Sequence, residues 1–179
     1  MSVFLAVDLD QPSRDLAQAL IETHRANFQA KWLRIDKLHC TLVFLGHPTA
    51  EQVAAWVPVI DSLAARHEGF SLRLRGAGTF VTARAPSVLW LGVVGELEKL
   101  ASLARDATQC LGGEQREFIP HVTLARARTA GAFDSLDLSG FQSSAFQVGQ
   151  LSLYESSAEV YRVVHRAPLT STVPHSVPV

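Results

Sequence analysis

Cysteine is scarce in this chain, and neither sign of charge dominates it. The two cysteines among 179 residues, Cys40 and Cys110, form no Cys-x-x-Cys pair, which argues against a disulfide scaffold. The formal net charge is −1, so no overall basic field indicates a long nucleic-acid partner. A small anionic substrate, or only the end of an RNA, would need just a local positive patch.

Long hydrophobic runs are also missing. The apolar stretch at the start of the chain is interrupted by Asp8 and Asp10, so it is too short for a secretion signal or a membrane span. The composition, 47% apolar and 18% charged, is that of a folded protein. We therefore expect a cytoplasmic monomer that contacts no membrane.

Apolar periodicity predicts an α+β fold with mainly antiparallel sheet, because the strand pairs lack a regular intervening helix. Strands are expected at residues 3–9, 31–35, 39–45, 70–80, 87–94, 120–126, 146–156 and 159–169. Helices are expected from Asp10 or Gln11 onward, at 50–67 after a Thr49–Gln52 capping box, and at 96–111. The first helix should bury Leu16, Ala19 and Leu20, and Pro58 should kink or split the second. Residues 170–179, rich in Pro and Ser, are expected to be a flexible tail.

One short pattern occurs twice. His39-Cys-Thr41-Leu and His121-Val-Thr123-Leu lie 82 residues apart, close to half the chain. Since alternate residues of a strand share a face, each histidine should project with its threonine while the intervening residue points to the core. If two lobes face one another, both imidazoles and both hydroxyls converge on one cleft.

That set of groups suits metal-free cleavage of a phosphodiester by in-line attack. One imidazole takes a proton from water while the other gives one to the leaving alkoxide, and hydroxyls donate to the non-bridging oxygens. The alternative to a catalytic role is a structural one, with two half-buried strand histidines that form local hydrogen bonds. A zinc site built on His39, His47 and His121 is disfavoured, because neither motif supplies a carboxylate ligand.

The chain resembles the bacterial and archaeal RNA 2',3'-cyclic phosphodiesterases, often called 2'-5' RNA ligases, of the two-histidine phosphoesterase superfamily. The resemblance extends over nearly the whole sequence, in the blocks "VFLAVDL", "WLRIDKLHCTLVFLG", "FIPHVTLAR" and "LSLYESS…VYRVVHRAPL". It implies one bilobal catalytic domain over residues 1–169, with two mainly antiparallel sheets, flanking helices and a pseudo-twofold axis around a central cleft. It also implies hydrolysis of a terminal 2',3'-cyclic phosphate on RNA to a 2'-phosphate without a cofactor, and reversible 2'-5' ligation as a side activity.

The resemblance implies roles for individual residues. His39 and His121 match the catalytic positions, and by analogy His121 is the base and His39 the acid. Thr41, Thr123 and Arg126 match phosphate-binding positions, although strict alternation turns Arg126 away unless the strand ends or bulges. Phe4 matches an aromatic position bordering the substrate.

Other residues allow less specific predictions. Trp32 and Tyr154 are candidates to stack a base, with ordinary packing as the alternative. Trp56 and Trp90 are expected in the core. Basic residues flank both motifs and could form a positive rim, namely Lys31, Arg34, Lys37, Arg116, Arg126 and Arg128. The remaining histidines are expected to be solvated, namely His24, His47, His67, His165 and His175.

Two other functions remain open from the sequence. A superfamily phosphodiesterase acting on a small cyclic nucleotide or a 2'-5' oligonucleotide would carry the same motifs. A non-catalytic module that binds RNA ends would have no need of paired proton-transfer groups, which argues against it.

Overall fold

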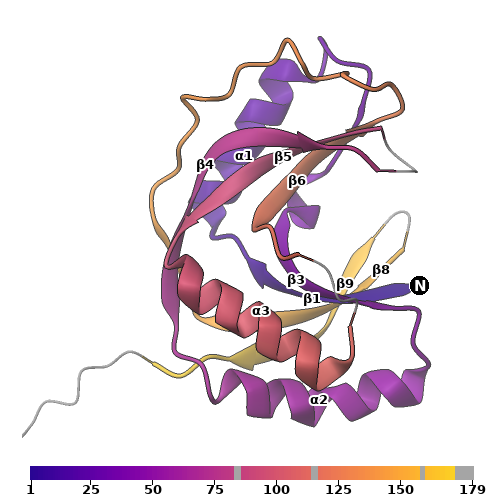
Figure 1. The fold of residues 1–179 in the computed structure, drawn as a ribbon, viewed down its shortest axis with the longest axis vertical. Coiled ribbons are helices and arrows are strands. Elements are labelled where there is room, and N and C mark those ends of the chain that lie inside the picture. Colours follow the sequence, from indigo (N-terminus) through magenta and orange to yellow (C-terminus); the bar gives the residue numbers. More distant parts are fainter. Residues whose placement is uncertain (83–85, 114–116, 158–159, 172–179) are drawn as a thin grey trace, which may run out of the picture.

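The computed structural model describes residues 1–82, 86–113, 117–157 and 160–171. The described helices are α1 (Gln11–His24), α2 (Ala50–Ala64), α3 (Leu97–Leu111) and a 3-10 turn, η1 (Ile35–Lys37). The described strands are β1 (Ser2–Asp8), β2 (Lys31–Trp32), β3 (His39–Gly46), β4 (Phe70–Phe80), β5 (Ser87–Gly95), β6 (His121–Ala127), β7 (Phe146–Val148), β8 (Gln150–Ser156) and β9 (Tyr161–Pro168). The predicted α+β class is confirmed (Figure 1).

All these strands join one antiparallel sheet. Its order is β7-β4-β5-β6-β3-β1-β8-β9, and β2 pairs with β6 beside this path. Two sheets were expected, one for each lobe. The lobes instead meet at the centre of a single sheet, because β3 and β6 share the register pair Cys40–Val122.

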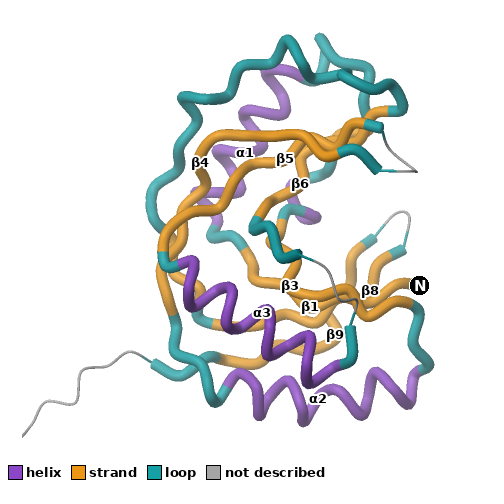
Figure 2. Tube along the Cα trace, viewed as in Figure 1, coloured by secondary structure: helices purple, strands orange, loops and turns teal. Residues whose placement is uncertain are grey.

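The sheet curls strongly, as Figure 2 shows. The segment expected as one strand at 146–156 divides at Gly149 into β7, which pairs with β4, and β8, which pairs with β1. The strand β7 lies at one end of the strand order and β8 lies next to the other end. Only Gly149 separates them in sequence, so the two ends of the sheet must lie close together in space. The helices α2 and α3 pack against one another, and α3 also lies against β3.

Three local predictions need correction. The helix α1 begins after Asp10 as expected, but it buries Ser13, Ala17 and Ile21 and leaves Leu16 39% exposed. The close-packed face of α1 is thus made partly of small side chains, which hydrophobicity alone does not single out. The helix α2 is not split, since it continues through Pro58 as one helix. The carbonyl that Pro58 leaves without a partner belongs to the exposed Ala54, where water can bind it.

The third correction concerns β2, which spans Lys31–Trp32 instead of 31–35 because η1 begins at Ile35. The expected tail is ordered at its start, since Thr170 bridges to Glu68 and donates its N–H to the His67 carbonyl. Residues 172–179 lie outside the described residues. Among the described helices, none is long and apolar enough to span a bilayer.

Candidate active site

The two His-x-Thr-Leu motifs lie side by side at the junction of the lobes. β3 and β6 are antiparallel neighbours whose paired residues, Cys40 and Val122, have buried side chains. The side chains on either side of that pair therefore project from the opposite face. The structure thus brings His39, Thr41, His121 and Thr123 together on one face, as the sequence predicted.

Both histidines are held by the same contact. Nδ1 of His39 lies 2.7 Å from the carbonyl oxygen of Lys37, and Nδ1 of His121 lies 2.7 Å from that of Ile119. A carbonyl oxygen only accepts, so each Nδ1 carries the hydrogen and each Nε2 keeps its lone pair. The Nε2 of His39 accepts a hydrogen bond from the Thr41 hydroxyl at 3.0 Å.

Aromatic rings surround His39. Its ring stacks on Phe4 with 4.6 Å between centroids, and the edge of Tyr161 approaches it at 5.6 Å. Burial lowers the pKa of His39 to about 4, Arg14 and His121 lower it as well, and the Lys37 carbonyl and Asp8 act to raise it. With this pKa His39 is neutral at pH 7.

A buried polar network lies beneath His39. Asp8 is the register partner of His39 on β1, and its carboxylate accepts hydrogen bonds from Tyr154 and, at 2.6 Å, from Ser152. Arg14 forms an ion pair with Asp8 at 3.4 Å. Asp8 was not predicted as a site residue, and the only sequence signal for it is that an acidic residue ends a buried strand.

His121 has different neighbours. The ring of Phe80 meets it edge-on at 4.9 Å between centroids, and that of Trp90 lies 6.2 Å away. Burial lowers the pKa of His121, and Arg126 lowers it further, against the effect of the Ile119 carbonyl. The assignment of Trp90 to the core is wrong, since it lies half-buried beside His121 on the site face.

Two β-bulges decide which residues share the site face. The register between β5 and β6 shifts at Leu124, and that between β1 and β3 shifts at Leu42. Each bulge inserts one extra residue into the alternation. Arg126 therefore faces the same side as His121, because the strand contains the bulge that this placement required. Phe44 occupies the equivalent place, five residues after His39.

The three aromatic residues expected to contact the nucleotide are poorly placed to do so. Phe4 is 2% exposed and Tyr154 7%, so both are covered, Tyr154 lying against Phe4 with 5.2 Å between centroids. Trp32 packs edge-on against Phe133 and pairs in register with the buried Ala125, on the core side of the sheet. Phe4 and Tyr154 are therefore covered, and Trp32 lies on the face of the sheet opposite the histidines. Phe44 is 42% exposed on the site face, but sequence alternation without the bulge hid it.

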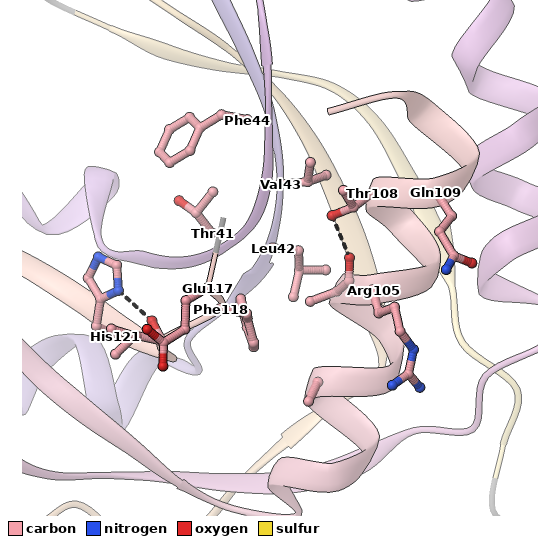
Figure 3. Close-up of a pocket in the computed structure, with 13 residues that line it drawn as sticks. Thr41, Leu42, Val43, Phe44, Arg105, Thr108, Gln109, Glu117, Phe118 and His121 are labelled. Atoms are coloured by element: carbon pink, nitrogen blue, oxygen red, sulfur yellow. Dashed lines mark hydrogen bonds between the residues drawn. The ribbon is translucent and has the colours of Figure 1, made fainter. Parts of the chain in front are cut away.

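A pocket of about 230 Å³ opens from the site (Figure 3). The strands β3 and β6 pair only at Cys40–Val122. Beyond that pair they diverge, and the gap between them extends to α3. Figure 3 shows the β3 residues Thr41 to Phe44 on one side and His121 with Glu117 and Phe118 on the other. Small α3 side chains, Ala101 and Ala104, are part of its lining.

The other histidines are partly structural. His67 binds Asp106 and His165 binds Asp61, at 3.0 and 2.7 Å, so these two are not simply solvated as expected. His24 and His47 are not buried, whereas His175 and Arg116 lie outside the described residues. In the part of the chain that the structure describes, no three His, Cys, Asp or Glu side chains are grouped to hold a metal ion.

Comparison with known proteins identifies relatives over nearly the whole chain. Residues 3–159 match the model of the 2'-5' RNA ligase superfamily. The RNA 2',3'-cyclic phosphodiesterase of Escherichia coli K12 is 33% identical over 160 residues, covering 87% of this chain and 86% of the relative. That of Methanothermobacter thermautotrophicus is 29% identical over 164 residues, covering 86% and 88%. The crystal structure of E. coli LigT complexed with 3'-AMP superimposes with a TM-score of 0.78 at 29% identity, covering 94% of this chain and 98% of that one.

Proposed function

This chain belongs to the 2'-5' RNA ligase superfamily, and from that premise we propose that it hydrolyses a terminal 2',3'-cyclic phosphate on RNA to a 2'-phosphomonoester. Relatives named for this activity match over most of its length. The observation that carries the proposal is the pair of imidazoles on neighbouring strands, each with Nδ1 held and Nε2 presented to the same face. Reversible 2'-5' ligation would be a side reaction of this site.

The mechanism that we propose uses general acid–base catalysis without a metal. His121 takes a proton from the attacking water, and His39 protonates the departing 3'-oxygen. Arg126 disfavours a proton on His121 and Asp8 favours one on His39, which suits this division of roles. Since burial lowers the pKa of His39 to about 4, a bound phosphate anion must raise this pKa before His39 can act as the acid.

The threonines and Arg126 would stabilise the phosphate. The Thr41 hydroxyl, which donates to His39 Nε2, would turn to a non-bridging oxygen when substrate binds. Thr123 would donate from the other strand. The exposed ring of Phe44 takes the place of Trp32 and Tyr154 as the surface on which the terminal base would stack.

The proposal treats residues 1–169 as one catalytic domain, because the acid and the base come from different lobes. Both histidines belong to the same chain, so a monomer would suffice. The RNA end is the proposed partner.

The first experiment is hydrolysis of adenosine 2',3'-cyclic phosphate and of a short RNA with the same end, in excess EDTA across pH 5–9. Wild type should give a bell-shaped profile and a 2'-phosphate product, and His39→Ala and His121→Ala should each lose roughly 10²- to 10⁴-fold in rate. Activity abolished by EDTA would contradict the metal-free mechanism. Turnover of only small nucleotides, or of 2'-5' oligonucleotides, would instead favour the small-substrate alternative, and no turnover a binding module.

The order of acid and base needs a separate test. His39→Gln and His121→Gln are compared on esters whose leaving groups differ in pKa. A better leaving group needs less protonation, so it should rescue His39→Gln and leave His121→Gln impaired. Rescue of His121→Gln alone would reverse the assignment.

A further inference from the structure

The strand β2 places a second cation beside Arg126. Lys31 is the direct register partner of Arg126, and both side chains are exposed. Directly paired residues of neighbouring strands share a face, so Lys31 projects from the site face as Arg126 does. The N–H of Leu33 donates to the carbonyl of the bulged Leu124 at 2.8 Å, which fixes β2 at this position.

Two like charges opposite one another destabilise a strand pair unless something compensates them. Within residues 1–82, 86–113, 117–157 and 160–171, neither Lys31 nor Arg126 forms an ion pair. The neighbouring Arg34 does, with Asp36 at 3.0 Å. The Lys31–Arg126 pair is thus an uncompensated positive site on the face that carries the histidines.

Among the described residues, the other half of the molecule has no such pair at the equivalent place. Lys31 lies eight residues before His39 and beside Arg126, five residues after His121. Eight residues before His121 is Gly113, and it lies against Phe44, five residues after His39. A Cβ on Gly113 would come within 2.0 Å of Val43 Cγ2, so no cation fits there without movement.

We propose that Lys31, with Arg126, forms a second anion subsite that binds the internucleotide phosphate next to the cyclic end of the RNA. This inference rests on the proposed function. A chain that ends in a 2',3'-cyclic phosphate continues in one direction only, toward its 5' end. A cationic pair on one side of the histidines, and an aromatic ring with glycine on the other, matches a substrate with phosphate on one side only.

The test compares three substrates, and the two dinucleotides among them differ by one charge at equal length. Adenosine 2',3'-cyclic phosphate lacks the internucleotide phosphate, the dinucleotide ApA with a cyclic end has it, and a methylphosphonate-linked dinucleotide has the same length without that charge. Wild type should prefer the phosphodiester dinucleotide over both others, by roughly tenfold in kcat/KM at low salt. The preference should fall with added salt, since a phosphate contact on single-stranded nucleic acid contributes a slope of about 0.7 in log–log form.

The variant Lys31→Gln should reduce the dinucleotide-to-mononucleotide ratio of kcat/KM several-fold and lower its salt slope by about 0.7. Lys31→Arg should retain the ratio. Arg34→Gln is the matched control, since it removes a nearby charge that Asp36 already neutralises, and its ratio should equal that of wild type. The subsite would be overturned if Lys31→Gln had the same dinucleotide-to-mononucleotide ratio of kcat/KM as wild type. It would also be overturned if Lys31→Gln lost as much kcat/KM on the methylphosphonate-linked dinucleotide as on the phosphodiester dinucleotide.

Binding separates this inference from the proposed function. Affinities for adenosine 2'-phosphate and for ApA ending in a 2'-phosphate are measured by calorimetry with wild type and Lys31→Gln. If wild type turns over neither cyclic substrate, the proposed function fails, and these affinities still test the subsite. A dinucleotide advantage that Lys31→Gln loses supports it, and one that Lys31→Gln retains overturns it.

Discussion

The Nδ1 atom of each motif histidine is held by a backbone carbonyl and not by a side chain. The carbonyls of Lys37 and Ile119, each two residues before its histidine, accept the Nδ1 hydrogen. The tautomer is therefore set by the path of the chain entering the strand, and it does not depend on which side chains occupy positions 37 and 119. The proposed use of Nε2 in both lobes rests on this single local geometry.

At the residue scale, the lowered pKa of His39 predicts a pH-dependent stability. The pKa rises from about 4 in the folded state to about 6.5 on unfolding, so the unfolded chain binds more protons between these values. The stability that neutral His39 contributes is full above pH 6.5 and is lost as the pH falls toward 4, by at most about 3 kcal/mol.

Denaturant unfolding of wild type and His39→Gln at pH 7, 5.5 and 4.5 measures this contribution. The free energy of unfolding of the variant should fall less steeply with pH, because the carboxylates titrate alike in both proteins. If the free energies of unfolding of the two proteins fell in parallel with pH, the pKa of His39 would not be lowered in the folded state.

Thr41 gives a second prediction at this scale. Thr41→Val keeps the shape of the side chain but removes the hydroxyl, so kcat/KM on the cyclic phosphate should drop by about 10². Thr41→Ser should remain within a few-fold of wild type. Steady-state kinetics of both variants decide the matter, and similar losses in the two would assign Thr41 a packing role.

At the scale of elements, β4 makes room for the ring beside His121. A Cβ on Gly78 would lie 2.2 Å from the Trp90 ring, so Gly78→Ala should displace the indole. We expect a loss of about 1–3 kcal/mol in unfolding free energy, together with reduced kcat. Gly149→Ala, whose Cβ would meet nothing within 4 Å, is the control in the same denaturation and rate measurements. Equal stability of the two variants would show that Trp90 is free to move.

The elements show what could be predicted from the sequence. The Asp10 cap and the Thr49–Gln52 box are local signals, and α1 and α2 begin where these predict. The helix α2 ends at Ala64 and not at residue 67, whereas α3 ends at Leu111 as expected. The bulge at Leu124 and the division at Gly149 depend on which strands become neighbours. Alternation therefore turned Arg126 the wrong way unless a bulge was assumed, and it missed Phe44 and Phe80 altogether.

At the scale of the whole molecule, the two lobes share few contacts through the centre of the sheet. Cys40, one half of the β3–β6 register pair, lies buried at this junction, and burial raises the pKa of its thiol to about 12. Cys110 is exposed on α3. The reactivity of Cys40 therefore reports on the separation of the lobes.

A thiol titration of the native protein should modify Cys110 quickly and Cys40 only slowly, whereas both react in denaturant. Adenosine 2'-phosphate should slow the reaction of Cys40 further, because a ligand bound by His39 and His121 holds the lobes together. The Cys110→Ser variant isolates the Cys40 signal. Fast native modification of that variant would show that the junction opens readily.

The bulges at Leu42 and Leu124 also change which of the following residues face the histidine side of the sheet. Plain alternation from His121 and Thr123 would favour position 125 for a residue that meets the substrate, yet Ala125 is fully buried. Moving the guanidinium one position, to Ala125→Arg with Arg126→Ala, would preserve the composition and nearly the spacing of the motif. It would also drive a charge into the core, at a cost that few folds of this size can absorb.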